Sequence, residues 1–81
     1  MGTPVRYALF KRAERVLYVT RWHYQLVRIE GAVVEEIVAG WGPKVRAAIG
    51  LYLQDVRDLG GPDARAAAAA IRAGWMTQVC P

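Results

Sequence analysis

The side chains best suited to binding chemistry alternate along one segment, residues 18–26. Arg21, His23 and Gln25 fall on one side of the alternation, and large apolar or aromatic residues fall on the other. This period of two is typical of a half-buried strand, so the polar row would point to solvent or to a partner. Guanidinium groups next to aromatic rings can contact phosphates and stack on bases. The pattern therefore predicts a binding surface that Arg28 extends, and the alternative is an ordinary solvated strand face.

A second candidate is the glycine-rich segment 40–46, which runs into the start of a predicted helix. Trp41, Lys44 and Arg46 belong to it. Backbone N–H groups at such a point attract anions, and the two basic side chains add positive charge. The helix that follows has its acidic residues near its C-terminal end, opposite to the order that the helix dipole favours. We expect an anion-binding or partner-binding role here, and the alternative is a plain loop with capping glycines.

Exposed tryptophan is the third feature. The chain has three Trp and four Tyr residues, more large aromatic side chains than so small a core can fully bury. Trp41 and Trp75 lie beside glycines at the ends of predicted elements, so we expect these two to be partly exposed. Trp and Tyr beside Arg are typical of the energetic centres of protein interfaces. The alternative is packing at the edge of the core.

Catalytic chemistry finds little support. His23 is the only histidine and Cys80 the only cysteine, and no serine accompanies them. Glu35 and Glu36 would point to opposite sides of a strand, so they could not act together as acid and base. We predict that the protein is not an enzyme and that it has no metal site and no cofactor.

Composition indicates one small folded domain. The chain has 81 residues, of which 54% are hydrophobic and 22% charged, with a net charge of +4. This is too apolar for a disordered segment, and no apolar run approaches the roughly 20 residues of a membrane-spanning helix. The N-terminus does not have the pattern of a signal peptide. With a single cysteine, we expect a reduced cytoplasmic protein without a membrane partner.

The first half of the chain predicts three strands. Residues 5–11 form the first, and the polar cluster 11–15 is expected to turn the chain back. Residues 16–30 form the second strand, and Gly31 suits the tight turn that follows. For residues 33–39 we favour a third strand on their β-branched content, while a short helix remains the alternative.

The second strand contains one irregularity. Its apolar residues occupy even positions up to Leu26, and then Val27 and Ile29 continue the series on odd positions. Such a change requires a β-bulge or a sharp bend, because otherwise every later side chain faces the wrong side. We therefore expect a bulge after Leu26.

The second half predicts two helices. Pro43 suits a first helical turn, and Gly60 and Gly61 end that helix. Asp63 favours the start of the second, which contains an alanine run and stops near Gly74. The first helix has apolar residues at alternating steps of four and three, namely Val45, Ile49, Tyr52, Val56 and Leu59.

These elements predict an α+β fold in a single domain, residues 1–81. A strand half (5–39) forms an antiparallel three-stranded sheet, and a helix half (43–74) packs two helices on one of its faces, in the order βββαα. Residues 75–81 form a short tail.

A non-enzymatic binding protein is the leading functional hypothesis. It would dock on a protein or nucleoprotein complex, like the small inhibitors that phages and mobile elements encode, anti-CRISPR proteins among them. That analogy is one of class and assigns no residues. The alternative is direct binding of DNA or RNA, against which the acidic residues appear to dilute any basic patch. A homodimeric structural module is the third hypothesis.

Overall fold

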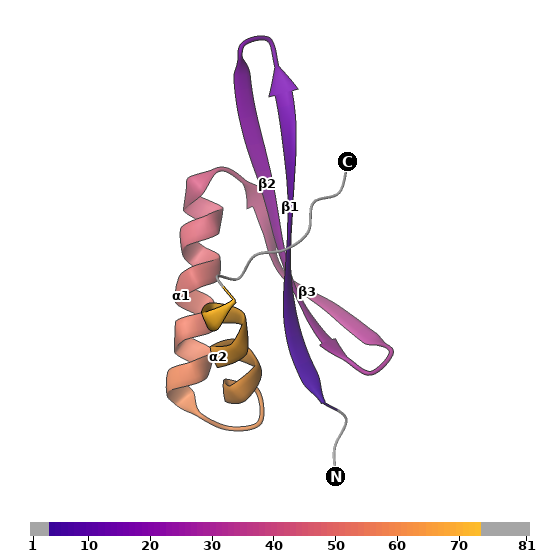
Figure 1. The fold of residues 1–81 in the computed structure, drawn as a ribbon, viewed down its shortest axis with the longest axis vertical. Helices are drawn as coiled ribbons and strands as arrows, with labels where there is room; N and C mark the ends of the chain where they lie inside the picture. Colours follow the sequence, from indigo (N-terminus) through magenta and orange to yellow (C-terminus); the bar gives the residue numbers. More distant parts are fainter. Residues whose placement is uncertain (1–3, 74–81) are drawn as a thin grey trace.

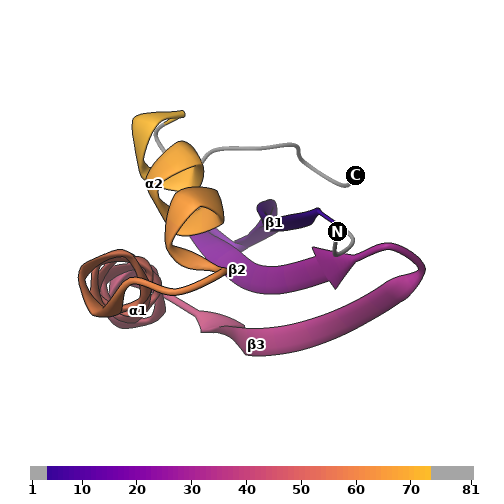
Figure 2. The ribbon, with the colours of Figure 1, turned by 90° about the horizontal axis from the view of Figure 1, so that it is seen from below.

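Three antiparallel strands followed by two helices form the part of the chain that the computed structural model describes, residues 4–73 (Figure 1). The strands are β1 (Val5–Val16), β2 (Val19–Glu30) and β3 (Val33–Trp41), and the helices are α1 (Pro43–Leu59) and α2 (Ala64–Arg72). β2 is the central strand and pairs with both others. Both helices lie on the same side of the sheet (Figure 2). The predicted βββαα arrangement is confirmed, whereas the stop at Gly74 and the tail 75–81 lie outside the described residues.

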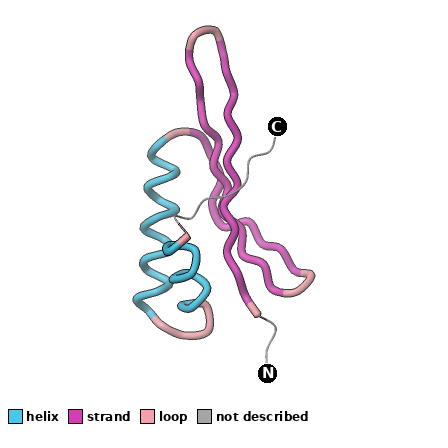
Figure 3. The backbone as a smooth tube through the Cα atoms, in the orientation of Figure 1, coloured by secondary structure: helices cyan, strands magenta, loops and turns pink. Residues whose placement is uncertain are grey.

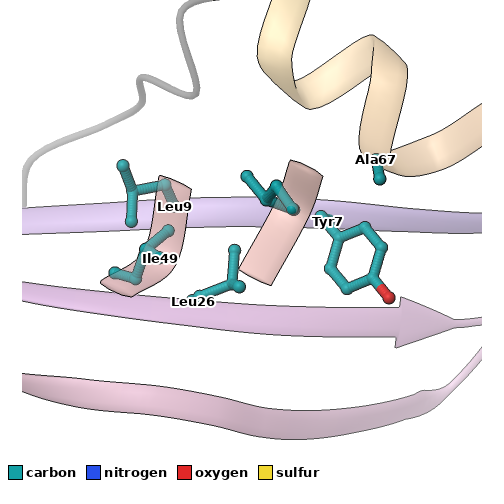
Figure 4. Packing of buried hydrophobic residues seen from close by; sticks show 6 residues of the cluster. Tyr7, Leu9, Leu26, Ile49 and Ala67 are labelled. Atoms are coloured by element: carbon teal, nitrogen blue, oxygen red, sulfur yellow. The ribbon is translucent and has the colours of Figure 1, made fainter. Parts of the chain in front are cut away.

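The core lies between the sheet and the two helices (Figure 4). Leu9 and Leu26 face each other across β1 and β2, and both are almost fully buried. Ile49 and Leu53, one turn apart on α1, and Ala67 of α2 are completely buried against them. Each large apolar side chain in this position stabilises the fold by about 1.5–3 kcal/mol. The small side chain of Ala67 lets α2 approach the sheet closely.

α1 begins and ends where the sequence predicts. Pro43 occupies its first turn and Gly60, with φ of 76°, follows its last residue. The predicted stripe packs on the core, except that Leu59 is 85% exposed because the helix ends there. Leu53, which the predicted stripe omits, is one of the two most buried residues of the helix.

Residues 33–39 form a strand, as we favoured, and the strand continues to Trp41. Gly40 pairs with Tyr24 near the end of β3. A Cβ atom on Gly40 would meet Cγ2 of Val45 at 2.8 Å, closer than real contacts of this kind. Glycine is therefore needed here because the strand and the first turn of α1 almost touch.

A polar cluster joins α2 to the sheet. The carboxylate of Asp63, just before α2, accepts bonds from Nε and Nη2 of Arg28 at 2.8 and 3.1 Å and from the Tyr7 hydroxyl at 3.3 Å. The bonds from Arg28 hold the pKa of Asp63 below its usual value. Burial, followed by the hydrogen bond with Tyr52, raises the pKa of Tyr7. Asp63 makes no side-chain cap on α2, so its function in the fold is to bind the sheet.

The prediction that residues 11–15 turn the chain is wrong. β1 continues through them, and its pairing with β2 runs without a break to Val16 opposite Val19. The turn consists of Leu17 and Tyr18. Neither residue is a usual turn former, whereas charged side chains in an exposed strand remain hydrated at little cost.

The irregularity after Leu26 is present, but the extra residue belongs to β3. Leu26 pairs with Val38 and Val27 with Glu36, so Ile37 is the bulged residue. β2 itself alternates regularly, because its pairing with β1 shows no shift. Leu26 and Val27 are 1% and 4% exposed and lie on opposite faces of the sheet.

The helices cover only part of the aromatic face of β2. Tyr24 packs on the core, but Trp22 is 38% and Tyr18 93% exposed. The reason is the length of the helical layer. α1 starts just after Trp41, and Trp41 lies opposite His23 in the register. The part of β2 that precedes His23 therefore extends past the helices.

Candidate functional site

A two-stranded hairpin projects beyond the helices along the long axis of the molecule (Figure 1, Figure 3). We call residues 12–22 the arm, and every one of them is exposed. The molecule measures 50 × 26 × 18 Å, and the arm accounts for much of its elongation. A hairpin with so little buried apolar surface is marginal alone, so the arm depends on the sheet that it continues.

At the base of the arm, Arg12, His23 and Trp41 occupy facing positions on three neighbouring strands. The rings of His23 and Trp41 meet edge to face, with their centres 4.9 Å apart. The Cζ atoms of Arg21 and Arg12 lie 4.6 and 5.7 Å from the centre of the Trp41 ring. Each cation–π contact contributes about 0.5–1 kcal/mol at an exposed site. Trp41 thus holds two guanidinium groups in defined positions.

Trp22 forms a second aromatic contact at the base of the arm. Nζ of Lys11 lies 5.2 Å from the centre of its ring. Its backbone oxygen accepts a 2.9 Å hydrogen bond from the N–H of Gly42, which ties the end of β3 to β2. Beside it lies an open hollow of about 350 Å³, lined by Thr20, Arg21, Trp22, Tyr24, Trp41, Gly42 and Pro43.

The tip of the arm is apolar. Val16, Leu17, Tyr18 and Val19 are 44%, 83%, 93% and 61% exposed. Leu17 has φ of 57° and is the only non-glycine residue with a positive φ among those described. The left-handed region costs a residue with a Cβ atom about 1–2 kcal/mol, which is why glycine usually occupies such turns. The turn therefore places a strained leucine in solvent.

Charge is segregated along the long axis. Six basic residues belong to the arm and to the elements at its base: Lys11, Arg12, Arg15, Arg21, Lys44 and Arg46. Among them is one acid, Glu14, which pairs with Arg21 at 3.4 Å. The other six acids lie on the far parts of β2 and β3, on the C-terminal half of α1 and before α2, mixed with five arginines. The arm end therefore has a net charge of about +5 and the rest about −1, within a total of +4.

The predicted polar row is only partly assembled. Arg21 and His23 lie together on the open face of the sheet, in contact with Trp41. Gln25 follows on the same strand, where its Nε2 donates a 2.8 Å hydrogen bond to Oε1 of Glu36. These residues share one face because β2 alternates without interruption.

Arg28 lies on the opposite face, and the prediction that it extends the polar row is wrong. It faces Tyr7 in the register, and its guanidinium binds Asp63 and, at 3.2 Å, Glu30. The bulge that was expected to bring it to the open face is in β3, so β2 never changes parity. Arg28 serves to hold α2 on the sheet.

The predicted basic residues of segment 40–46 lie close to the arm. Lys44 and Arg46 are exposed on the first turns of α1, which starts beside the base of the arm (Figure 1). The N–H of Arg46 donates to the oxygen of Gly42, and Gly42 has φ of 93°. Trp41 itself is the last residue of β3 rather than part of a loop.

Sequence reasoning missed several residues of this region. Lys11, Arg12 and Arg15 were assigned to a turn, and Leu17 and Trp22 to a strand covered by helices. The alternation of Trp22 with its neighbours was read correctly, but the length of the helical layer decides which aromatic residues stay exposed. The absence of any usual turn residue between 11 and 20 was the available signal that the hairpin is long.

Reactive groups are not gathered in this region. Within residues 4–73, no three His, Cys, Asp or Glu side chains are placed to hold a metal ion. No helix in the described part of the chain is long and apolar enough to cross a membrane. Comparisons with protein-family models, with curated proteins and with solved structures find no match. The function must therefore be inferred from the arm and its base.

Proposed function

We propose that this protein is a non-enzymatic binding protein that contacts nucleic acid through the arm and its base. The observation that carries the proposal is the segregation of charge, with six basic residues and one acid at the arm end. A phosphate backbone is attracted to such a surface, and neutralised phosphates release counterions, which supplies most of the sequence-independent affinity.

The arrangement of the arginines supports this choice. Arg12 and Arg21 stack on Trp41, so less side-chain entropy is lost when they bind a phosphate than if they were unconstrained. Guanidinium groups form two parallel hydrogen bonds with phosphate oxygens. The exposed rings of Trp22 and Tyr18 add apolar surface suited to bases.

Acidic residues were the main objection to nucleic-acid binding at the level of the sequence. In the fold, the acids at 30, 35, 36, 55, 58 and 63 lie away from the arm. Their position removes that objection, so we rank nucleic acid above a protein partner.

A protein or nucleoprotein partner is the second candidate, as for a small inhibitor of the phage-encoded kind. The apolar tip, Val16 to Val19, is the observation that favours it, because exposed apolar side chains beside arginines are typical of protein interfaces. We place either activity in the cytoplasm, since a single cysteine suits a reducing compartment.

Charge reversal tests the leading proposal. Arg12→Glu with Arg21→Glu should weaken binding to a labelled DNA duplex by more than tenfold, because phosphate contacts become repulsions. The matched control is Arg57→Glu with Arg65→Glu, which makes the same change in net charge on exposed helix positions at the far end. We expect a much smaller loss for the control, measured by fluorescence anisotropy. Equal losses for the two pairs would refute a site on the arm.

A further inference from the structure

The apolar tip of the arm has no counterpart in the binding of phosphates. Leu17 and Tyr18 are 83% and 93% exposed, at the point of the molecule farthest from the helices (Figure 3). We infer that the tip is a wedge that enters the base stack of double-stranded DNA while the shaft of the arm lies in a groove. This inference rests on the proposed function and adds to it the kind of nucleic acid and the way it is deformed.

The chemistry of the turn is the first support. A two-residue hairpin turn with a positive φ at its first position is normally occupied by glycine there. This chain has Leu17 instead, at φ of 57°, followed by Tyr18. At their exposure, neither side chain gains enough packing within the described residues to offset the strain. Strained residues of this kind collect at sites that act on something outside the fold.

The distribution of charge identifies the occupant. Basic residues border the tip at Arg15 and Arg21 and continue down the shaft to Arg12 and Lys11. From residue 15 to residue 11 a strand advances by about 13 Å. A flat anionic membrane would engage charges at one depth around the tip. A partner with negative charges along the whole shaft and an apolar interior at its end fits better, and duplex DNA has both.

Groove dimensions favour DNA over double-stranded RNA. A two-stranded β-ribbon fits the grooves of B-form DNA, whereas the major groove of A-form RNA is too deep and narrow for side chains to read. Leucine and other apolar side chains that enter the stack partly separate two base pairs and kink the duplex. Pyrimidine–purine steps are the easiest to open, so the wedge should prefer them.

A turn replacement removes the wedge and keeps the arm. In Leu17→Gly with Tyr18→Asn, glycine occupies the position with positive φ and asparagine follows it, a pair common in such turns. The variant should melt at the same temperature as the wild type or higher, because the strain at Leu17 is relieved. Tyr18→Ser alone provides a second variant with the original residue at position 17.

The experiment uses a short duplex with a central TA step and a donor and an acceptor dye at its ends. Binding of the wild type should raise energy transfer, because a kink brings the ends together, and the TA step should respond more than an A-tract. The turn variant should bind within a few-fold of the wild type, with the same salt dependence, and leave energy transfer unchanged.

Three results would overturn the inference. If the wild type binds the duplex in a salt-dependent way without raising energy transfer, the wedge is wrong and the proposed function stands. If the wild type shows no salt-dependent binding, the proposed function itself fails. If the tip variants lose binding to anionic lipid vesicles, or lose self-association seen in the wild type, and DNA bending is the same for all proteins, the tip serves that other occupant.

Discussion

At the residue scale, the contacts around Asp63 illustrate how one carboxylate determines the position of a helix. Arg28 and Tyr7 both donate to it from the sheet, while Asp63 lies at the start of α2. The sequence indicated Asp63 as a helix start, but nothing in the local pattern tied it to Arg28, which is 35 positions earlier. Long-range pairs of this kind depend on the register of the strands, which a single sequence does not display.

Asp63 also predicts the acid dependence of stability. Its pKa is lowered in the folded state, so it contributes stability above its unfolded pKa of about 3.9, and this contribution is lost as the pH falls through its folded pKa. We expect Asp63→Asn to lower the melting temperature by about 5 °C at pH 7 and to converge on the wild type near pH 2. Thermal melts followed by circular dichroism across this range would measure it. Parallel curves for the two proteins would contradict the account.

At the scale of elements, the helices were the easier part to predict, because their signals are local. Pro43, Gly60 and a stripe of apolar side chains define α1 without reference to the rest of the fold. The arm was missed because Leu17 and Tyr18 have no turn chemistry, and the bulge was assigned to the wrong strand because parity in β2 does not reveal which partner carries the extra residue.

The junction between β3 and α1 offers a test of packing between elements. Gly40→Ala places a Cβ atom against Cγ2 of Val45, so we expect it to destabilise the fold by about 1–3 kcal/mol. Val45→Ala removes that methyl group. In a double-mutant cycle measured by denaturant unfolding, the double variant should therefore lose less stability than the two single losses combined. Additive losses would show that the close approach is not the cause.

At the scale of the whole molecule, the charge of the arm end is a property of the fold and not of the composition. The sequence provides a modest +4 with mixed signs, and the hairpin and the direction of α1 separate the signs along the long axis. The candidate residues Arg21, His23, Trp41, Lys44 and Arg46 could be named in advance. Their common location beside the arm could not, because it requires knowing where the helical layer ends.

The arm is separable from the core. Arg12 and His23 are paired four positions below Val16 and Val19, so the same kind of two-residue turn can join them. Replacing residues 13–22 by Asn-Gly should change the free energy of unfolding by less than about 1 kcal/mol, because every residue removed is exposed. Denaturant unfolding measures this, and a large loss of stability would show that the arm is part of the core.

The measurement that tests the central claim most directly is the binding of this shortened protein and the wild type to one labelled DNA duplex at two salt concentrations, about 50 and 200 mM. For the wild type we predict an affinity that falls by at least tenfold between them, as expected when several phosphates are neutralised. For the shortened protein, folded but without its arm, we predict an affinity at least tenfold weaker at the lower salt concentration. Equal binding by the two proteins, or binding by the wild type that ignores salt, would contradict the claim that the arm is a nucleic-acid interface.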